Sequence, residues 1–231
     1  MCIRDRSIFK HFLTRLYNAK TVENILSKSI VLSPPIDNKL FKAPIKKENI
    51  IVMKVKGGRE LKVLGDIVAR IAEKYRDWSI YVIGYLDQRL SQKVREYIGG
   101  QRERLVVLPN LSEEKKINLL SKAKIYIHPV KYEHFGIIIG EALALGCRVL
   151  VHRFSGIIYD IVSYYGRDSL KHVRKCIATY NDYSDIAEAL QVMEDIEDYN
   201  PSLCRELVKP FQEHVFKHKV KTLMRNFIEG V

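Results

Sequence analysis

Residues 125–151 read IYIHPVKYEHFGIIIGEALALGCRVLV, in which two short apolar runs flank a loop and a longer apolar segment. The runs 125–129 and 148–151 are typical of buried strands in a parallel sheet. Residues 136–145 between them have the length and composition of a buried helix. A strand, a helix and a second strand in this order predict a right-handed βαβ unit.

The same alternation continues on both sides of this stretch. We expect strands at 50–53, 79–84 and 105–108, and helices at 60–75, 88–98, 112–123, 157–165, 184–195 and 203–229. Ser112 precedes two glutamates and is suited to cap the helix that follows it. Strands that alternate with helices predict the fold class α/β, with a doubly wound, Rossmann-like parallel sheet. Such sheets bind ligands at the carboxyl ends of their strands.

The first 40 residues are organised differently. Residues 8–28 have helical spacing of apolar positions, and a short strand is expected at 30–32. Ser33-Pro34-Pro35-Ile36-Asp37-Asn38 follows, and its two prolines favour an extended linker. We place a domain boundary near this linker.

The chain of 231 residues has a formal net charge of +12. This charge favours an anionic partner: a nucleic acid, an anionic membrane surface or a phosphorylated small molecule. Because the basic residues are spread along the chain and no nucleic-acid-binding motif occurs, nucleic acid is not the expected partner. No apolar run is long enough to cross a membrane, and the N-terminus lacks the apolar stretch of a signal peptide. We therefore expect a cytoplasmic protein.

Cysteine and histidine spacing gives no sign of a metal site. Four cysteines (Cys2, Cys147, Cys176 and Cys204) stand far apart, and reduced thiols are the simplest interpretation for a cytoplasmic protein. His214 and His218 could share a helix face, but no further ligand type accompanies them, so a solvated face is expected.

The loop after the strand 125–129 contains the strongest candidate site. Gly136 permits a turn, and the helix that it starts presents the N–H groups of Gly136, Ile137 and Ile138. These amides and the helix dipole would suit a diphosphate. Glu133, in the loop before the helix, can accept hydrogen bonds from sugar hydroxyls.

Glu141 interrupts the apolar pattern of the same helix. A carboxylate in such surroundings is costly without a partner, and the vicinal diol of a ribose would suit it. Alternatively, Glu141 lies at the solvent edge of the helix or caps neighbouring backbone.

Other loops at the same predicted edge contain weaker signals. Lys54 and Arg59 flank a glycine-bearing turn after the first strand, and both could reach a phosphate, although a basic turn with two glycines is commonplace. Gly84 either lets backbone approach a ligand or makes a turn. Ser155-Gly156 opens a further helix, with Asp160 beyond it. His128 and His134 could touch a ligand, but a strand-end histidine is more often packed.

Taken together, these residues resemble the C-terminal domain of the retaining, GT-B-fold glycosyltransferases of group 1. The E-x7-E signature of that family matches Glu133 and Glu141, with Phe135-Gly136 between them. Pro34-Pro35-Ile36-Asp37 resembles its interdomain segment, and 111–114 its turn before the signature strand. The resemblance covers about residues 29–200.

The resemblance implies a role for each candidate residue. Glu133 would contact the donor sugar, Glu141 the ribose, and the amides of Phe135, Gly136 and Ile137 the sugar and diphosphate. Lys54 and Arg59 would clamp the diphosphate, in place of the Arg and Lys usual in the family. Ser155-Gly156 stands where the family often has two glycines.

The resemblance also implies the donor and the reaction. The residues around Glu133 are similar to those of the mannosyltransferases that build lipid-linked oligosaccharides. This similarity favours GDP-mannose as the donor, with a UDP-sugar as the other possibility. Transfer would retain the anomeric configuration and need no metal or other cofactor. The acceptor is a lipid-linked or other glycan that the sequence does not identify, and a basic face could hold the protein on an anionic membrane.

We expect three segments on this basis. Residues 1–28 would be a remnant of an acceptor domain: its last helix, after a few first residues that match nothing expected before that helix. Residues 29–200 would be the nucleotide-sugar domain. Residues 201–231 would be a helix that crosses back to the acceptor domain. The chain would then bind donor weakly and catalyse little alone. A nucleotide-sugar 2-epimerase or a phosphorylase of the same fold, and a non-catalytic nucleotide- or nucleic-acid-binding module, are the alternatives.

Overall fold

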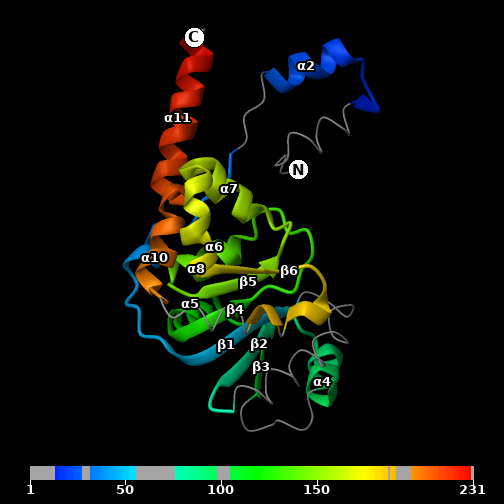
Figure 1. Ribbon diagram of the computed structural model, residues 1–231, viewed down its shortest axis with the longest axis vertical. Coiled ribbons are helices and arrows are strands. Elements are labelled where there is room, and N and C mark those ends of the chain that lie inside the picture. The colour runs from blue at the N-terminus through cyan, green and yellow to red at the C-terminus, as the bar shows by residue number, and fades with distance from the viewer. Residues whose placement is uncertain are drawn as a thin grey trace.

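The computed structural model describes residues 14–27, 32–55, 76–97, 105–186, 188–190 and 199–229. Its centre is a six-stranded parallel sheet of order β3-β2-β1-β4-β5-β6 (Figure 1). The strands are β1 (Glu48–Val55), β2 (Ser79–Gly84), β3 (Leu105–Pro109), β4 (Ala123–Ile127), β5 (Arg148–His152) and β6 (Ile177–Tyr180). The predicted fold class, α/β with a doubly wound parallel sheet, is confirmed.

The helices are α2 (Ala19–Ser27), α4 (Gln88–Tyr97), α5 (Glu113–Lys122), α6 (Ile137–Ala144), α7 (Gly156–Tyr165), α8 (Leu170–Cys176), α10 (Pro201–Leu207) and α11 (Glu213–Glu229). Four short 3-10 helices accompany them among the described residues: η1 (Asn38–Lys42), η2 (Arg167–Ser169), η3 (Tyr183–Asp185) and η4 (Lys209–Phe211). As predicted, the Ser112 hydroxyl caps α5 by accepting a hydrogen bond from the Lys115 amide.

The core has two layers because successive side chains of a strand point to opposite faces of the sheet. In β1, Val52 packs in a large cluster with residues of α5, α6, α7 and α8, whereas Ile51 and Met53 pack in a second cluster on the other face. Both layers are apolar, so the central strands β1, β4 and β5 consist mostly of buried residues, whereas the edge strand β3 is only partly buried.

The C-terminal segment differs from the prediction. A single helix at 203–229 was expected, but the structure has α10, η4 and α11 in succession. Pro210 lies in η4 and cannot continue an α-helix, because it lacks an N–H and its ring clashes with the preceding turn. The linker joins this segment at Ile36, whose amide donates to the Phe211 carbonyl (2.7 Å) and whose carbonyl accepts from the Glu213 amide (3.0 Å).

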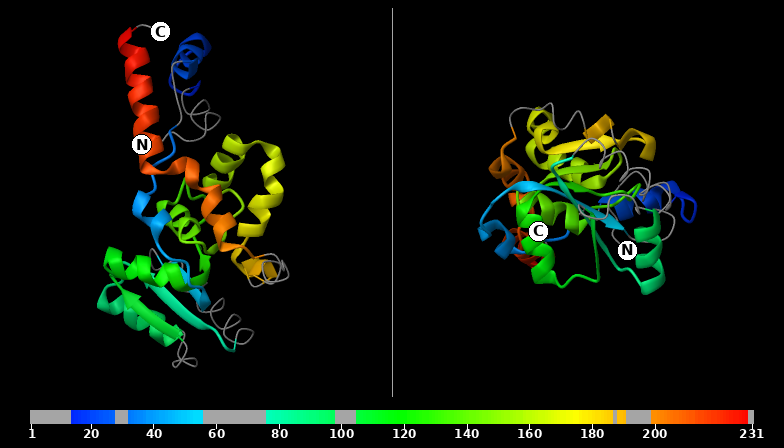
Figure 2. Two further views of the ribbon diagram at one scale, coloured as in Figure 1. Left: turned by 90° about the vertical axis from the view of Figure 1, so that its left-hand side faces the viewer. Right: turned by 90° about the horizontal axis from the view of Figure 1, so that it is seen from below.

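The N-terminal prediction is also corrected. Within the described part of 8–28, the helix is interrupted before α2, where the Asn18 side chain accepts from the Thr21 amide (2.9 Å) and so acts as a helix cap. Leu32 is not in a strand, and the rest of the strand predicted at 30–32 lies outside the described residues. The predicted helix 60–75 and half of the predicted helix 184–195 (residues 187 and 191–195) also lie outside them. In Figures 1 and 2, α2 and α11 lie beyond the same end of the sheet.

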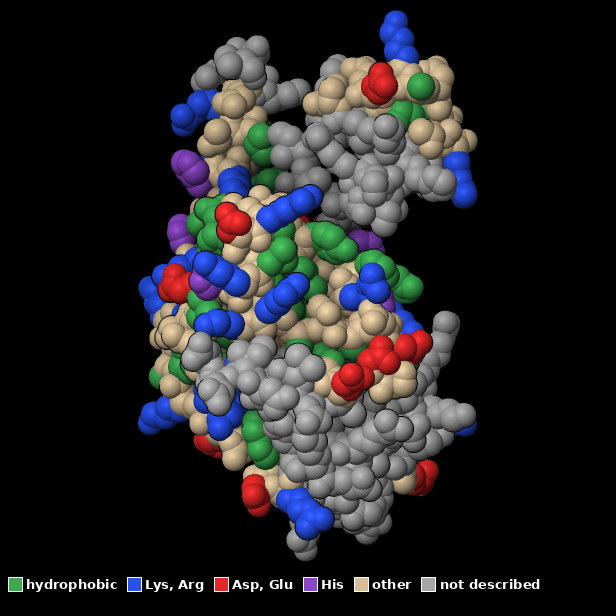
Figure 3. Space-filling view, viewed as in Figure 1, with side chains coloured by type: hydrophobic (Ala, Val, Ile, Leu, Met, Phe, Trp, Pro, Cys, Tyr) green, Lys and Arg blue, Asp and Glu red, His purple; other side chains and the backbone are tan. Residues whose placement is uncertain are grey.

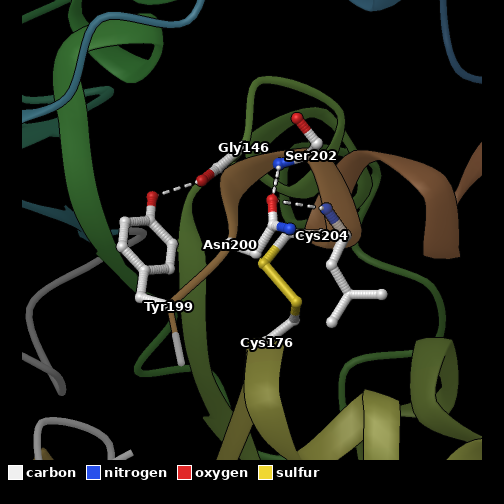
Figure 4. The surroundings of a disulfide bond; sticks show 7 residues. Gly146, Cys176, Tyr199, Asn200, Ser202 and Cys204 are labelled. Carbon is white, nitrogen blue, oxygen red and sulfur yellow. Dashed lines mark hydrogen bonds between the residues drawn. A yellow bond between two sulfur atoms is a disulfide. The ribbon is translucent and has the colours of Figure 1, made fainter. Parts of the chain in front are cut away.

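The expectation of four reduced cysteines is wrong for two of them. Cys176, at the end of α8, and Cys204, in α10, form a disulfide with a Cα–Cα distance of 5.3 Å (Figure 4). The bond forms because α10 packs against α8 in the core, which brings two residues 28 positions apart into bonding range. Cys147 is buried and unbridged.

Candidate functional site

The reversal of strand order lies between β1 and β4, which are neighbours in the sheet. The register pairs Met53 with Ile127, so Lys54 and His128 each follow a paired position at the carboxyl edge. Ligands of doubly wound sheets bind in the crevice outside this reversal point. The loop 128–136 starts there and leads into α6.

Glu133 is held in this loop by several contacts. Its Oε2 lies 3.2 Å from His128 Nε2, and its Oε1 accepts from the His134 amide at 3.1 Å. Its main-chain carbonyl accepts from the Gly156 amide at 3.0 Å. The side chain is one-fifth exposed, at 21%. The loop therefore presents a carboxylate that is fixed in place and still reaches the surface.

Gly136 makes the turn from this loop into α6. Its φ of +65° lies in the left-handed region, and a Cβ there would press on the side chains of Ile139 and Glu133. The first hydrogen bonds of the helix run from the amides of Ile139 and Gly140 to the Gly136 carbonyl. The Ile137 and Ile138 amides precede those bonds and form the positive end of α6.

The side chains next to this turn have different environments. Phe135 is buried and makes an edge contact with Phe211, at a ring separation of 5.4 Å. Ile137 is half exposed. Because its ring is buried, Phe135 can reach a ligand only through its main chain, and its ring anchors the loop to the C-terminal segment. The predicted contacts of both main-chain amides with a ligand stay predictions.

Glu141 lies in the second turn of α6 and is 13% exposed at its side chain. Its Oε2 is 2.7 Å from Lys116 Nζ of α5, and Lys116 also pairs with Glu113 at 2.9 Å. Burial lowers the pKa of Lys116, but the hydrogen bonds to Glu141 and Glu113 outweigh it and the pKa is raised. The sequence indicated that the Glu141 carboxylate needs a partner, and in the structure Lys116 is one. The sequence did not identify this lysine.

Lys54 is the penultimate residue of β1 and partly buried, while Arg59 lies outside the described residues. Gly84 ends β2 beside Val55, and a Cβ at its φ of +155° would overlap the Val55 carbonyl oxygen. The glycine is thus required by the close approach of β1 and β2. Its contact with a ligand stays a prediction.

Ser155 and Gly156 connect β5 to the loop of Glu133. Gly156 begins α7 and donates its amide to Glu133 as described above, so the loops after β4 and β5 are joined at the site. Ser155 is fully buried, and within the described residues its hydroxyl has no hydrogen-bond partner. Asp160 accepts from the hydroxyl of Ser33 at 2.8 Å, which ties α7 to the linker.

Charged side chains are spread over the face of the molecule that Figure 3 shows. On the face shown in Figure 3, Lys and Arg side chains are scattered, and Asp and Glu side chains lie among them. Among the described residues, no group of three or more His, Cys, Asp or Glu side chains could hold a metal ion. No helix in that part of the chain is both long enough and apolar enough to span a bilayer.

Solved structures with the same fold cover most of this chain. It is similar to sucrose-phosphate synthase from Thermosynechococcus elongatus, at 17% identity and a TM-score of 0.63 over 87% of this chain and 53% of that one. It is also similar to the UDP-GlcNAc 2-epimerase of Neisseria meningitidis, solved bound to UDP-GlcNAc, at 18% identity and a TM-score of 0.51 over 80% and 46%. The catalytic domain of starch synthase IV from Arabidopsis thaliana, bound to ADP and acarbose, matches at 12% identity and a TM-score of 0.51 over 75% and 39%.

This chain thus spans about half the length, or less, of these structures. A search of curated proteins gives no significant match. The family model described as glycosyl transferases group 1 matches residues 35–223, which include every described strand of the sheet and the loop of Glu133 and Glu141. The chain therefore belongs to the glycosyl transferases group 1 family.

Proposed function

We propose that this chain is the donor-binding half of a retaining hexosyltransferase whose donor is a nucleotide sugar. The arrangement of Glu133, the start of α6 and Glu141 supports this most directly. A nucleotide sugar presents, in order, sugar hydroxyls, a diphosphate and a ribose diol. The loop and helix present, in the same order, a carboxylate, the amides that precede the first hydrogen bonds of α6, and a second carboxylate.

The spacing suits that order. From Ile137 to Glu141 the helix rises about 6 Å, since each residue adds 1.5 Å. The amides at the start of α6 are positive and favour a diphosphate, whereas Glu133 and Glu141 accept hydrogen bonds from hydroxyl groups. A free anion alone would gain nothing from the two carboxylates, so the combination favours a ligand with hydroxyls on both sides of its phosphates.

The chemistry proposed for this half is electrostatic. When the bond between the anomeric carbon and the diphosphate breaks, negative charge grows on the leaving phosphate oxygens. The α6 amides and Lys54, with Arg59, would stabilise that charge. The acceptor hydroxyl would attack the anomeric carbon on the face that the diphosphate leaves and pass its proton to the leaving diphosphate, which retains the configuration. We place the acceptor site in a second domain, matching the half of the similar structures that this chain does not cover.

Calorimetry of the 231-residue chain tests the proposal. The ligands are GDP-mannose, our favoured donor, and UDP-glucose, and the affinities for GDP and UDP are measured separately for comparison. Glu141→Ala should weaken binding of the best nucleotide about tenfold, since it removes hydrogen bonds to a charged acceptor. Glu113→Ala is the matched control, because Glu113 pairs with the same lysine from outside the proposed ribose contact. Equal affinities of Glu141→Ala and the unaltered chain would rule out this ribose contact.

An epimerase is the second candidate, because one similar structure is a UDP-GlcNAc 2-epimerase. The match to the glycosyl transferases group 1 family favours transfer over epimerisation. Incubation with UDP-GlcNAc, followed by chromatography of the sugar, separates the two: inversion at C2, which carries the acetamido group, would show epimerisation, which we do not expect.

A further inference from the structure

His128 is a buried histidine directly beside the candidate site. It follows the last residue of β4, and only 2% of it is exposed. Its main chain is fixed at both ends: the amide donates to the Leu150 carbonyl (2.8 Å), and the carbonyl accepts from the Tyr180 hydroxyl (3.1 Å). The backbone of His128 is therefore held by residues of the neighbouring strands β5 and β6.

Both ring nitrogens of His128 have partners. Nδ1 lies 3.0 Å from the hydroxyl of Tyr126, which is fully buried, and Nε2 lies 3.2 Å from Glu133 Oε2. An ionised carboxylate can only accept, so Nε2 carries a proton and donates to Glu133. In the neutral ring Nδ1 must then accept, and the Tyr126 hydroxyl donates to it. The chain Tyr126–His128–Glu133 is thus directional, and it runs from the tyrosine hydroxyl toward the carboxylate.

We propose that His128, with its tautomer selected by Tyr126, is a positioning residue that holds the Glu133 carboxylate toward the hydroxyls of the donor sugar. The inference rests on the proposed function, in which Glu133 contacts that sugar. A glutamate side chain has several rotatable bonds, and fixing it before the ligand arrives lowers the entropic cost of binding. The N–H of His128 can fix the Glu133 side chain in this way, because it is buried in the core and points in one direction.

A purely structural role for His128 predicts something different. If the imidazole only fills space at the end of β4, its replacement disturbs the whole loop, and nucleotide sugar and nucleoside diphosphate lose affinity together. A positioning role predicts a loss confined to the nucleotide sugar, because the diphosphate lacks the group that Glu133 contacts.

The test measures, by calorimetry on the 231-residue chain, affinities for GDP-mannose and UDP-glucose and for GDP and UDP. His128→Phe keeps a ring but removes the donor; its nucleotide-sugar affinity should fall about tenfold and its diphosphate affinity change less than about twofold. His128→Gln, which can donate from a similar position, should recover most of the loss. Tyr126→Phe should lose about two- to threefold, because the ring keeps its place but not its selected tautomer.

A double-variant cycle decides whether His128 acts through Glu133. Glu133→Gln alone should weaken nucleotide-sugar binding, and adding His128→Phe to it should weaken binding by less than about twofold more, since residues in one hydrogen-bond network are not additive. Unchanged nucleotide-sugar affinity in His128→Phe, equal losses for sugar and diphosphate, or additive losses in the cycle would each overturn the inference.

The outcomes also separate this inference from the proposed function. If Glu133→Gln weakens the nucleotide sugar and His128→Phe does not, only the role of His128 is lost. If Glu133→Gln has no effect, or no nucleotide binds the unaltered chain, the donor-sugar contact fails and the inference fails with it. Circular dichroism of His128→Phe and His128→Gln checks that both are folded.

Discussion

The disulfide between Cys176 and Cys204 allows a sharp prediction for stability. Both cysteines are almost fully buried, and the bond fastens the end of α8 to α10 (Figure 4). Cys204→Ala opens a loop that spans 28 positions of sequence. The unfolded chain then regains the freedom that the crosslink removed, so the free energy of unfolding falls.

The size of this effect follows from the loop length. Closing a loop of this size removes about 12 cal/mol/K of chain entropy from the unfolded state, or about 3.6 kcal/mol at 25 °C. Deleting a buried sulfur adds about 1 kcal/mol for lost packing. We therefore expect Cys204→Ala to be less stable by about 4–5 kcal/mol.

Urea unfolding followed by circular dichroism measures the loss. Cys147→Ala is the control, because Cys147 is buried but unbridged and its replacement changes no loop. We expect Cys147→Ala to lose about 1–2 kcal/mol, clearly less than Cys204→Ala. Equal losses in the two variants would refute the loop-closure reasoning.

Thiol titration checks the bond itself. The chain has four cysteines, so the unfolded, unreduced protein should show two reactive thiols, and four would show that the bond is absent. Because disulfides are rare in reducing compartments, the same titration on freshly extracted protein also tests the expected cytoplasmic location.

Three further perturbations test the site and its surroundings. Gly136→Ala should lose about 1–2 kcal/mol to left-handed strain and also weaken nucleotide-sugar binding. Gly166→Ala is the control: its φ of +81° and ψ of 172° also strain an alanine, but it lies in open space away from the site, so it should lower stability in thermal unfolding and leave binding unchanged. Lys116→Met leaves Glu141, 13% exposed, without its lysine and should cost about 1–3 kcal/mol in urea unfolding at pH 7. The pKa of Lys116 in the folded protein is raised above its ordinary 10.5, so its contribution to the free energy of unfolding is complete below pH 10.5 and is lost as pH rises through the raised pKa. If the stability difference between Lys116→Met and the unaltered chain does not shrink in that range, the pairing is contradicted. Tyr199→Phe removes a partly buried hydroxyl that donates to the main-chain carbonyl of Gly146 and should lower stability by about 1 kcal/mol, and an unchanged urea midpoint would count against that hydrogen bond.

Local features of the sequence were sufficient for most of the described sheet. Apolar runs and the spacing of the helices between them located β1 to β5, because a buried strand needs alternate or consecutive apolar side chains and these are visible in a short segment of sequence. Ser112 was identifiable as a cap because its effect is confined to one helical turn. The four-residue β6 was missed, since a run that short is not distinctive, and the break at Pro210 was missed although proline is a local signal.

Glu133 and Glu141 were also found from the sequence, because the signature lies within one loop and one helix. What holds them depends on the tertiary structure. Lys116 reaches Glu141 from 25 positions away, and Tyr180 of β6 reaches His128 from 52 positions away, once the strands are assembled into the sheet. The bond between Cys176 and Cys204 likewise requires α10 to pack on α8. Short-range propensities decide where helices and strands form, but contacts between distant residues arise from how those elements pack, and no local pattern encodes them.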